Sequence, residues 1–285
     1  MMTARNRVDP VAEAYNRDPE REWHRLVKDS YHSLEFLVTM HYLRKHLPPK
    51  GRVLDAGGGP GRYALELCRA GYDVVLLDLS SELISLAREK FSTEPEVVKE
   101  RLLEFVVGDI RNLSRFETGG FDAVLCLGPL THISDEAERQ QAMAELVRVA
   151  KPGAVVCISV VGHLAALRTI LAKCRDELGT VAFETMVAQG DSLVGGVWWH
   201  FFRADELKQC AEECDLKTLE MVGCEGLSTG LAEATNAIGQ DEAKWQAWLD
   251  VVLRTSTEPA VVDMAGHILY IGCKELCMNV ELEIR

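Results

Sequence analysis

The stretch Val53-Leu54-Asp55-Ala56-Gly57-Gly58-Gly59-Pro60-Gly61-Arg62 decides how the rest of the chain is interpreted. Apolar residues that end in an acid indicate the end of a buried strand, and four glycines follow within five positions. The next residues, Tyr63–Cys68, have the pattern of a helix. Glycine lets the backbone approach a ligand closely, and a helix N-terminus presents unpaired N–H groups. A strand that turns through glycine into a helix is therefore typical of nucleotide-binding folds.

The sequence of the glycine loop differs in two ways from that of a dinucleotide-binding loop, and these differences indicate the kind of ligand. Such a loop reads G-x-G-x-x-G, and here Gly57 and Gly59 fit the first two positions while Arg62 stands at the third. Asp55 precedes the first glycine, and its charge would repel a pyrophosphate but attract an ammonium or a sulfonium group. The loop therefore favours a cationic nucleoside ligand. The alternative is an ordinary glycine-rich turn between a strand and a helix.

Composition and charge narrow the class of protein. The chain has 285 residues, of which 47% are hydrophobic and 26% are charged, which is typical of a globular protein. It has 31 basic and 44 acidic residues, and no basic cluster of the size that a nucleic-acid interface needs, so we expect no nucleic-acid partner. No N-terminal signal and no apolar run of membrane-spanning length is present. We therefore expect a soluble, cytoplasmic protein with no membrane partner.

The nine cysteines show no disulfide spacing. Several fall in apolar strand or helix patterns and are expected in the core: Cys68, Cys126 and Cys157. Two further pairs are four residues apart, Cys210 with Cys214 and Cys273 with Cys277. Metal ligation is one interpretation of these pairs. A helical core face shared with Leu207 and Ala211 explains the first pair without a metal, so no metal site is expected.

Apolar segments alternate with helical patterns along most of the chain. We expect strands at 52–55, 73–77, 103–107, 121–127, 154–160, 218–222 and 267–273. Near-continuous apolar strands separated by helices predict a parallel sheet covered on both faces. The fold class is therefore α/β, a Rossmann-like, seven-stranded and mostly parallel sheet with helices on both faces.

The remaining segments are additions to this sheet. Residues 1–50 are expected to form an N-terminal helical cap, with starts at Asp9-Pro10 and Asp18-Pro19. One apolar helix face continues through this segment: Phe36, Met40, Leu43 and Leu47. Residues 51–285 form the main domain, with helical insertions at 162–202 and 226–265. The tail 275–285 shows only a weak alternation.

Three acids, Asp55, Asp78 and Asp109, each follow a predicted strand. Ligands of such sheets bind outside the carboxyl ends of the strands, so we expect these side chains around one ligand. Asp78 is placed to accept both ribose hydroxyls, and Asp109 an adenine amino group with Ile110 against the ring. Asp55 lies where an ammonium would bind. For any one of these acids, a helix N-cap is the simpler interpretation.

These motifs resemble the cofactor-binding core of class I S-adenosylmethionine (SAM) dependent methyltransferases of small molecules. The resemblance covers 52–160: the glycine loop, the acid Asp78, Gly108-Asp109-Ile110, the segment 121–132, and the turn 147–153 in which Ala154 replaces a second glycine. It implies the strand order 3-2-1-4-5-7-6 with the seventh strand antiparallel. It also implies SAM as cofactor and S-adenosylhomocysteine as product. The implied cofactor contacts are Asp55, Gly57, Gly58, Gly59, Gly61, Arg62, Asp78, Leu79, Asp109, Ile110 and Leu127.

The resemblance implies an in-line displacement at the sulfonium methyl. His132 is the candidate general base, and a wall residue of the pocket is the alternative. The N-terminal cap, with Tyr15, Trp23 and His24, and the insertions are expected to enclose a small-molecule substrate. Trp198, Trp199 and His200 are the candidate contacts, although a hydrophobic plug explains them too. Arg62 is a candidate for the methionine carboxylate, His267 is expected to be structural, and a homodimer is left open.

Three other functions remain open at this stage. An aminopropyltransferase shares the fold, but such enzymes usually carry an acid where Pro60 stands. A non-catalytic SAM-binding protein would use the same loop without turnover. An NAD-dependent oxidoreductase is disfavoured because Arg62 replaces a glycine and Asp55 opposes phosphate. The methyltransferase interpretation is the one that all three strand-end acids support.

Overall fold

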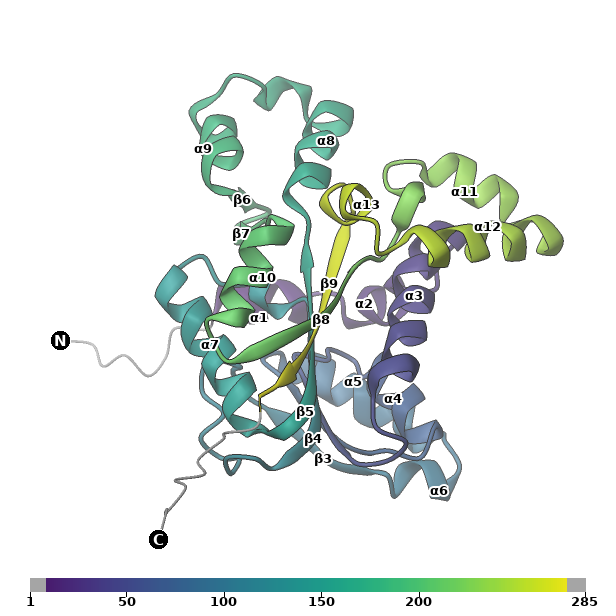
Figure 1. Cartoon of the computed structure of the whole chain (residues 1–285), viewed down its shortest axis with the longest axis vertical. Helices are drawn as coiled ribbons and strands as arrows, with labels where there is room; N and C mark the ends of the chain where they lie inside the picture. Colours follow the sequence, from purple (N-terminus) through teal and green to yellow (C-terminus); the bar gives the residue numbers. More distant parts are fainter. Residues whose placement is uncertain (1–8, 276–285) are drawn as a thin grey trace, which may run out of the picture.

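The computed structural model describes residues 9–275 and contains the predicted sheet (Figure 1). Seven strands lie in the order β3-β2-β1-β4-β5-β9-β8. β9 is antiparallel to both its neighbours, and the other pairs are parallel. The order and the antiparallel seventh strand are therefore confirmed. The bounds are β1 Arg52–Ala56, β2 Asp73–Asp78, β3 Leu102–Val107, β4 Phe121–Leu127, β5 Ala150–Val161, β8 Leu216–Gly223 and β9 His267–Lys274.

Helices cover both faces because each central strand is apolar on both sides. In β4, Val124 and Cys126 face one core cluster, while Ala123 and Leu125 face the other. The first cluster is closed by α7 and α10, and the second by α3, α4, α5 and α6. Their bounds are α3 Ser30–His46, α4 Arg62–Arg69, α5 Ser81–Ser92, α6 Glu96–Lys99, α7 Glu136–Val149 and α10 Ala204–Glu212.

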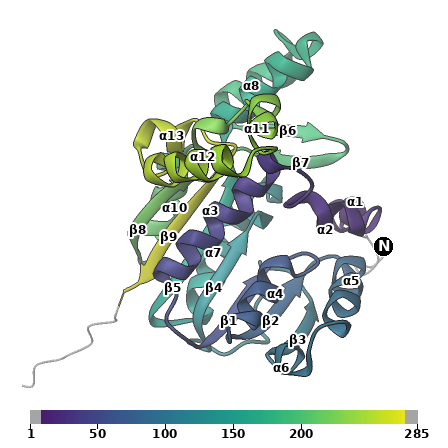
Figure 2. The ribbon, with the colours of Figure 1, turned by 90° about the vertical axis from the view of Figure 1, so that its right-hand side faces the viewer.

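The N-terminal cap consists of α1 (Pro10–Asn16), α2 (Pro19–Arg25) and α3. Asp9 and Asp18 are the N-caps of the first two helices, and each accepts a hydrogen bond from a backbone N–H of its helix. A proline follows each of them in the first turn, as the sequence predicts. Figure 2 shows α1 and α2 between the sheet and the β6–β7 hairpin, while α3 runs along the sheet.

The first insertion is only partly helical, which corrects the expectation. It contains α8 (His163–Lys173) and α9 (Val181–Gln189), and then the hairpin of β6 (Asp191–Val194) and β7 (Val197–His200). Gly195 and Gly196 make the two-residue turn with φ of 61° and 84°. Two successive residues with positive φ are what a tight hairpin turn requires. In Figure 1 this insertion projects from the top of the molecule.

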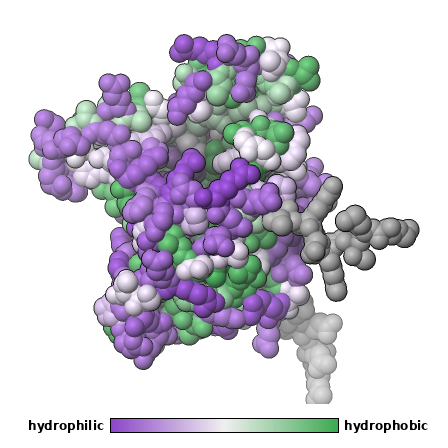
Figure 3. Space-filling model, turned by 180° about the vertical axis from the view of Figure 1, so that it is seen from behind, coloured by the Kyte–Doolittle hydropathy of each residue, from purple (hydrophilic) through white to green (hydrophobic). Residues whose placement is uncertain are grey.

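The second insertion is helical, as expected, with α11 (Ala232–Ile238), α12 (Glu242–Thr255) and α13 (Pro259–Asp263). Trp245 and Trp248 of α12 pack against the core cluster on the α3 side of the sheet. Figure 3 shows a largely hydrophilic band across the back of the molecule, with hydrophobic residues both above it and below it. Exposed apolar side chains of the first insertion include Leu171, Val181, Leu193 and Trp198.

Some sequence expectations concern other parts of the chain. Cys210 and Cys214 pack partly buried against the core, as their helical face predicts. Cys277 and most of the tail lie outside the described residues. Between residues 9 and 275, no helix is long and apolar enough to cross a membrane.

Candidate active site

The glycine loop between β1 and α4 takes a conformation that requires glycine. Gly57, Gly59 and Gly61 have φ of 79°, 58° and 81°, which L side chains rarely adopt. A Cβ on Gly57 would lie 2.0 Å from Cγ of Pro129. The backbone N–H groups of Gly57 and Gly58 donate to the carbonyl of Leu77, at 2.6 and 3.1 Å. The loop is thereby held against the carboxyl end of β2.

Asp55 lies fully buried beneath this loop. Neither of its carboxylate oxygens has a hydrogen-bond partner, and a Cβ on Gly58 would lie 2.4 Å from Oδ2 of Asp55. Burial and the charge of Asp78 raise the pKa of this carboxyl to about 7, although the backbone N–H of Ala64, which approaches the carboxylate without an aligned hydrogen bond, lowers it. A buried carboxylate without a partner is costly, and a nearby cation would stabilise its charged form. The position therefore suits an ammonium or a sulfonium.

Asp78 ends β2 and borders the same loop. Its Oδ2 accepts a hydrogen bond from the Gly59 N–H and its Oδ1 one from the Ser80 N–H, both at 2.8 Å. Burial raises its pKa to about 6, although these hydrogen bonds act in the opposite direction. A carboxylate has about four acceptor sites, so two remain for ribose hydroxyls. Leu79 follows directly in the chain. The structure thus brings Asp55 and Asp78 together, as the sequence predicts.

Asp109 is differently placed. Its carboxylate accepts hydrogen bonds from the backbone N–H of Arg111, at 2.8 Å, and from the guanidinium of the same residue. Arg111 also contacts Asp9 of the cap and Glu138 of α7. Ile110 is buried in the core, and Leu127 at the end of β4 is partly buried. The carboxylate of Asp109 therefore belongs to an ion-pair network that joins the cap to α7.

Arg62 holds the cap over the loop. Its Nε and Nη2 both donate to the carbonyl of Trp23 in α2, at 2.8 and 2.5 Å. Its guanidinium carbon lies 4.0 Å from the centroid of the Trp23 ring. The sequence suggested that Arg62 either binds the methionine carboxylate of the cofactor or is exposed to solvent, and neither interpretation describes these contacts. In the described structure Arg62 is a tether between α4 and α2.

Three segments far apart in the sequence meet at His132. The 3₁₀ turn Pro129–His132 after β4 carries this imidazole, whose Nε2 is hydrogen-bonded to the Tyr15 hydroxyl at 2.7 Å. The ring of Trp199 from β7 lies 4.4 Å away, centroid to centroid, in an edge contact. Burial lowers the pKa of His132 to about 4, although the nearby Trp198 backbone acts in the opposite direction, and its Nδ1 makes no aligned hydrogen bond. His132 is therefore a neutral but weakly basic group, enclosed by the cap and the first insertion.

The side chains of Trp198, Trp199 and His200, the predicted substrate contacts, point in alternating directions along β7. Trp199 faces His132, whereas Trp198 is half exposed. His200 is buried, with Nδ1 at 2.8 Å from Asp191 and Nε2 at 2.7 Å from Glu206. It fastens the hairpin to α10 and makes these contacts instead of the predicted substrate contact. A surface cavity of about 330 Å³ opens beside it and is lined in part by His163, Phe201, Arg203 and Glu206.

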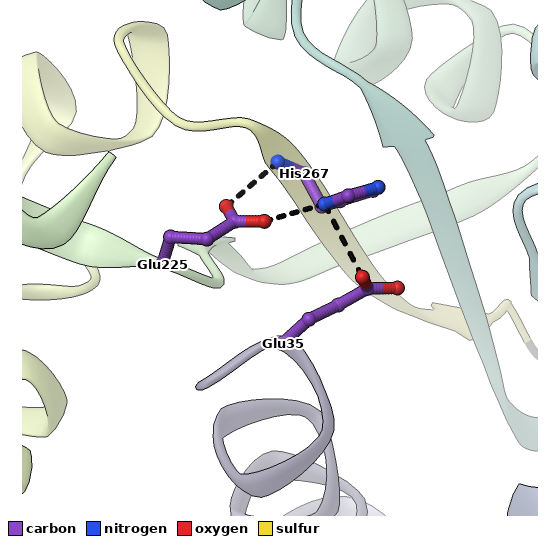
Figure 4. A group of neighbouring side chains, drawn as sticks. All are labelled: Glu35, Glu225 and His267. Atoms are coloured by element: carbon purple, nitrogen blue, oxygen red, sulfur yellow. Dashed lines mark hydrogen bonds and ion pairs between the residues drawn. The ribbon is translucent and has the colours of Figure 1, made fainter. Parts of the chain in front are cut away.

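A buried charged cluster was not predicted from the sequence. Glu35 of α3 accepts hydrogen bonds from Arg25 of α2 at 2.6 and 3.1 Å, and Arg25 also contacts Glu22. Nδ1 of His267, the first residue of β9, lies 2.5 Å from Glu225 and 3.4 Å from Glu35 (Figure 4). The sequence did contain a sign of this cluster, because Glu35, Thr39 and Tyr42 are polar residues at helical spacing. In the structure all three lie on a buried face, with exposed fractions of 8%, 1% and 4%.

Comparisons with known proteins agree with this geometry. Residues 54–158 match the family described as "Methyltransferase domain". A glycine/sarcosine N-methyltransferase of Aphanothece halophytica is 35% identical over 108 residues, which are 38% of this chain and 39% of that protein. A ubiquinone biosynthesis O-methyltransferase of Xanthomonas axonopodis pv. citri is 33% identical over 130 residues, 45% of this chain and 51% of that protein. A solved SAM-dependent methyltransferase of Methanosarcina mazei has a TM-score of 0.59 at 23% identity, covering 82% of this chain and 97% of its own.

Residues 54–158 therefore carry a methyltransferase domain, and the fold around them is similar to that of a solved SAM-dependent methyltransferase. The matched segment of this methyltransferase domain runs from β1 to β5 and contains the glycine loop and all three strand-end acids. The chain spans about half the length of the curated relatives it matches. The cap and both insertions lie outside the matched segment, so the match does not extend to Tyr15 or Trp199.

Proposed function

We propose that this protein transfers the methyl group of SAM to a small-molecule acceptor. The observation that carries the proposal is the buried, unpartnered carboxylate of Asp55 beneath a loop that only glycine can form. SAM has both a cationic group for Asp55 and ribose hydroxyls for the neighbouring Asp78. When bound, SAM supplies an activated methyl group, so the protein's own task is to align the acceptor and exclude water.

The cofactor contacts proposed from the sequence are carried forward with one change. Gly57, Gly58, Gly59, Gly61, Leu79, Ile110 and Leu127 remain the proposed cradle. Asp109 remains the proposed partner of the adenine amino group, which has to compete with Arg111 for the carboxylate. Arg62 is proposed to act through the cap, because its guanidinium already holds the Trp23 carbonyl.

The acceptor is proposed to bind between α1, the turn after β4, and β7. The support is the meeting of Tyr15, His132 and Trp199, one from each segment. The related proteins named above act on glycine or sarcosine and in ubiquinone biosynthesis, which agrees with a small acceptor whose methylated atom is nitrogen or oxygen. Tyr15 also lies close enough to Asp78 for that carboxylate to raise the pKa of its hydroxyl, after burial and Glu22. The cap is therefore expected to rearrange when SAM enters.

Calorimetric titration with SAM and S-adenosylhomocysteine tests the proposal. The wild type should bind both, and Asp78→Asn should weaken binding at least about tenfold, because the ribose loses a charged acceptor. Asp250→Asn, an exposed acid on α12, is the matched control and should bind like the wild type. Tighter binding of decarboxylated SAM would point to an aminopropyltransferase. Absence of binding by the folded wild type refutes the proposal.

A further inference from the structure

We propose that His267 is the general base of this methyl transfer and that Glu225 positions it. The inference rests on the proposed function and names the chemistry of its acceptor: a phenolic hydroxyl or an amine, whose proton must leave as the methyl group arrives. His267 was expected from the sequence to be structural. Its place in the sheet, the direction of its ring and the groups around it support the catalytic role.

The sheet topology brings His267 to the ligand-binding edge. β9 is antiparallel, so its first residue lies at the carboxyl edge, where it pairs with Val161, the last residue of β5. The N–H of Val161 in turn donates to Oγ1 of Thr131, at 3.1 Å, and Thr131 precedes His132. The two imidazoles therefore come from neighbouring positions of one edge. Because adjacent strands are about 4.8 Å apart, β4 and β9 are roughly 10 Å apart across β5.

The orientation of the ring leaves one nitrogen available. Glu225 accepts two hydrogen bonds from His267, one from Nδ1 at 2.5 Å and one from the backbone N–H at 2.9 Å. With Nδ1 carrying the proton, the lone pair of the neutral ring is on Nε2. Nε2 makes no hydrogen bond to any residue between 9 and 275, and Figure 4 shows it directed away from both glutamates. A carboxylate on one nitrogen and a free second nitrogen are the geometry of a positioned base.

The same cluster continues to the glycine loop. Glu35, which also approaches Nδ1 of His267, is bound by Arg25, and Arg25 is bound by Glu22. A Cβ on Gly59 would lie 3.9 Å from Cγ of Glu22. The cluster therefore extends from His267 to Glu22, which borders the loop proposed to hold SAM.

His132 is the weaker candidate for the same role. Its Nε2 is already engaged by the Tyr15 hydroxyl, and burial lowers its pKa to about 4. Phenols and ammonium groups release their protons near pH 10, so a base of that strength is poorly matched to them. The free nitrogen of His267 belongs to a much stronger base.

The charges that face His267 explain this strength. Burial lowers its pKa, but the charges of Glu35 and Glu225 and the hydrogen bond to Glu225 outweigh burial, and Arg25 opposes them. The result is a pKa of about 9. The other titratable groups that interact with these glutamates are Tyr31 and His32 of α3, Tyr15 of α1, Tyr63 of α4 and Cys224 after β8.

The proposed step is balanced within the two substrates and the protein. A lone pair of the acceptor oxygen or nitrogen forms the new bond to the methyl carbon. The carbon–sulfur bond breaks, and its electron pair stays on sulfur as S-adenosylhomocysteine leaves. The acceptor's proton passes to Nε2 of neutral His267, and the resulting imidazolium is stabilised by Glu225 and Glu35 until it releases the proton to solvent.

A titration of imidazole NMR signals tests the base without any acceptor. In the full chain with S-adenosylhomocysteine, the signal lost in His267→Gln should titrate near pH 9 and show the proton of the neutral ring on Nδ1. Glu225→Gln retains the imidazole and should shift this titration to lower pH by one unit or more, on the order expected for the loss of a contacting carboxylate. A titration below pH 7, a proton on Nε2 or an unchanged Glu225→Gln value overturns the proposal.

Steady-state kinetics then test the role in transfer. The acceptors are sarcosine, catechol and 4-nitrocatechol, whose nitro group makes the hydroxyl more acidic. For catechol, kcat/KM should rise about tenfold per pH unit up to about pH 9 in the wild type. His267→Gln should lower kcat/KM at least about 100-fold at neutral pH, and its remaining rise should follow the ionisation of catechol near pH 10 instead of levelling off near pH 9. His41→Gln, an exposed histidine of α3, is the control and should behave like the wild type.

The nitro compound separates catalysis from a purely structural role. Because 4-nitrocatechol arrives largely ionised at alkaline pH, His267→Gln should methylate it within about threefold of the wild-type rate. Equal losses for both phenols, or a His267→Gln profile that still levels off near pH 9, overturn the base role. If SAM binds and neither the phenols nor sarcosine are methylated, the acceptor class is wrong. Failure to bind SAM refutes the proposed function instead. The NMR titration is independent of that outcome, because it measures only the protonation of His267.

Discussion

The substitution Asp55→Asn is expected to stabilise the folded chain at alkaline pH while abolishing SAM binding. Asp55 is fully buried, and neither carboxylate oxygen has a partner. Its charged form is therefore unfavourable in the folded protein without a bound cation. An amide of the same shape removes the charge and also removes the attraction for the ammonium or sulfonium of SAM.

The magnitude follows from the pKa, which rises from 3.8 to about 7 on folding, chiefly through burial and secondly through Asp78. A carboxyl with a raised pKa binds its proton more tightly in the folded state, so stability falls as pH rises from 3.8 through about 7. At about 1.4 kcal/mol per pKa unit, full ionisation costs about 4 kcal/mol. Roughly 2 kcal/mol of this loss falls between about pH 5.5 and about pH 8.

The assay is urea unfolding of wild type and variant, followed by tryptophan fluorescence at those two pH values. The difference in unfolding free energy should move by about 2 kcal/mol in favour of Asp55→Asn on going to the higher pH. His267 also contributes a pH-dependent stability, because its pKa is raised from 6.5 to about 9 on folding. This stabilisation is complete below about pH 6.5 and is lost as pH rises through about 9. It is the same in both proteins, so it cancels in the difference. A difference that does not depend on pH would refute the assignment of a raised pKa to Asp55.

Two other predictions concern the loop and the hairpin. Gly58→Ala places a Cβ 2.4 Å from the buried carboxylate below it, so it should lower the unfolding free energy by about 1–3 kcal/mol and abolish SAM binding in calorimetry. Gly71→Ala is the control, because its Cβ would meet nothing within 4 Å, and only backbone strain of about 1 kcal/mol at its φ of +94° is expected, with SAM binding retained. His200→Asn removes the contacts that fasten the hairpin to α10, so the position of Trp199 should loosen. The acceptor KM should then rise about tenfold with SAM affinity unchanged, and a change in SAM affinity alone would contradict this account.

The sheet could be predicted from the sequence because its signals are local. Strand periodicity, the glycine loop and the proline-marked helix starts each depend on residues within a few positions of one another. The hairpin in the first insertion was missed although Gly195-Gly196 is a hairpin turn signal, because the flanking segment was interpreted as part of a helical insertion. The rule that ligands bind at the carboxyl ends of parallel strands correctly predicted that the Asp78 side chain lies beside the glycine loop. For Asp109 the same rule did not reveal that Arg111 would bind the carboxylate.

The sequence by itself determined the part of this protein that carries the proposed SAM site: a strand, a glycine turn and a helix, followed by further strands and helices that form a sheet with acids at its carboxyl edge. Only the tertiary structure decided which distant side chains meet there. Tyr15 and His132 are 117 residues apart, and Glu225 and His267 are 42 apart. Such meetings depend on how the cap and insertions pack on the sheet, and no spacing within one segment records that packing. The carboxylates around His267, which set its basicity, come from two other elements for the same reason.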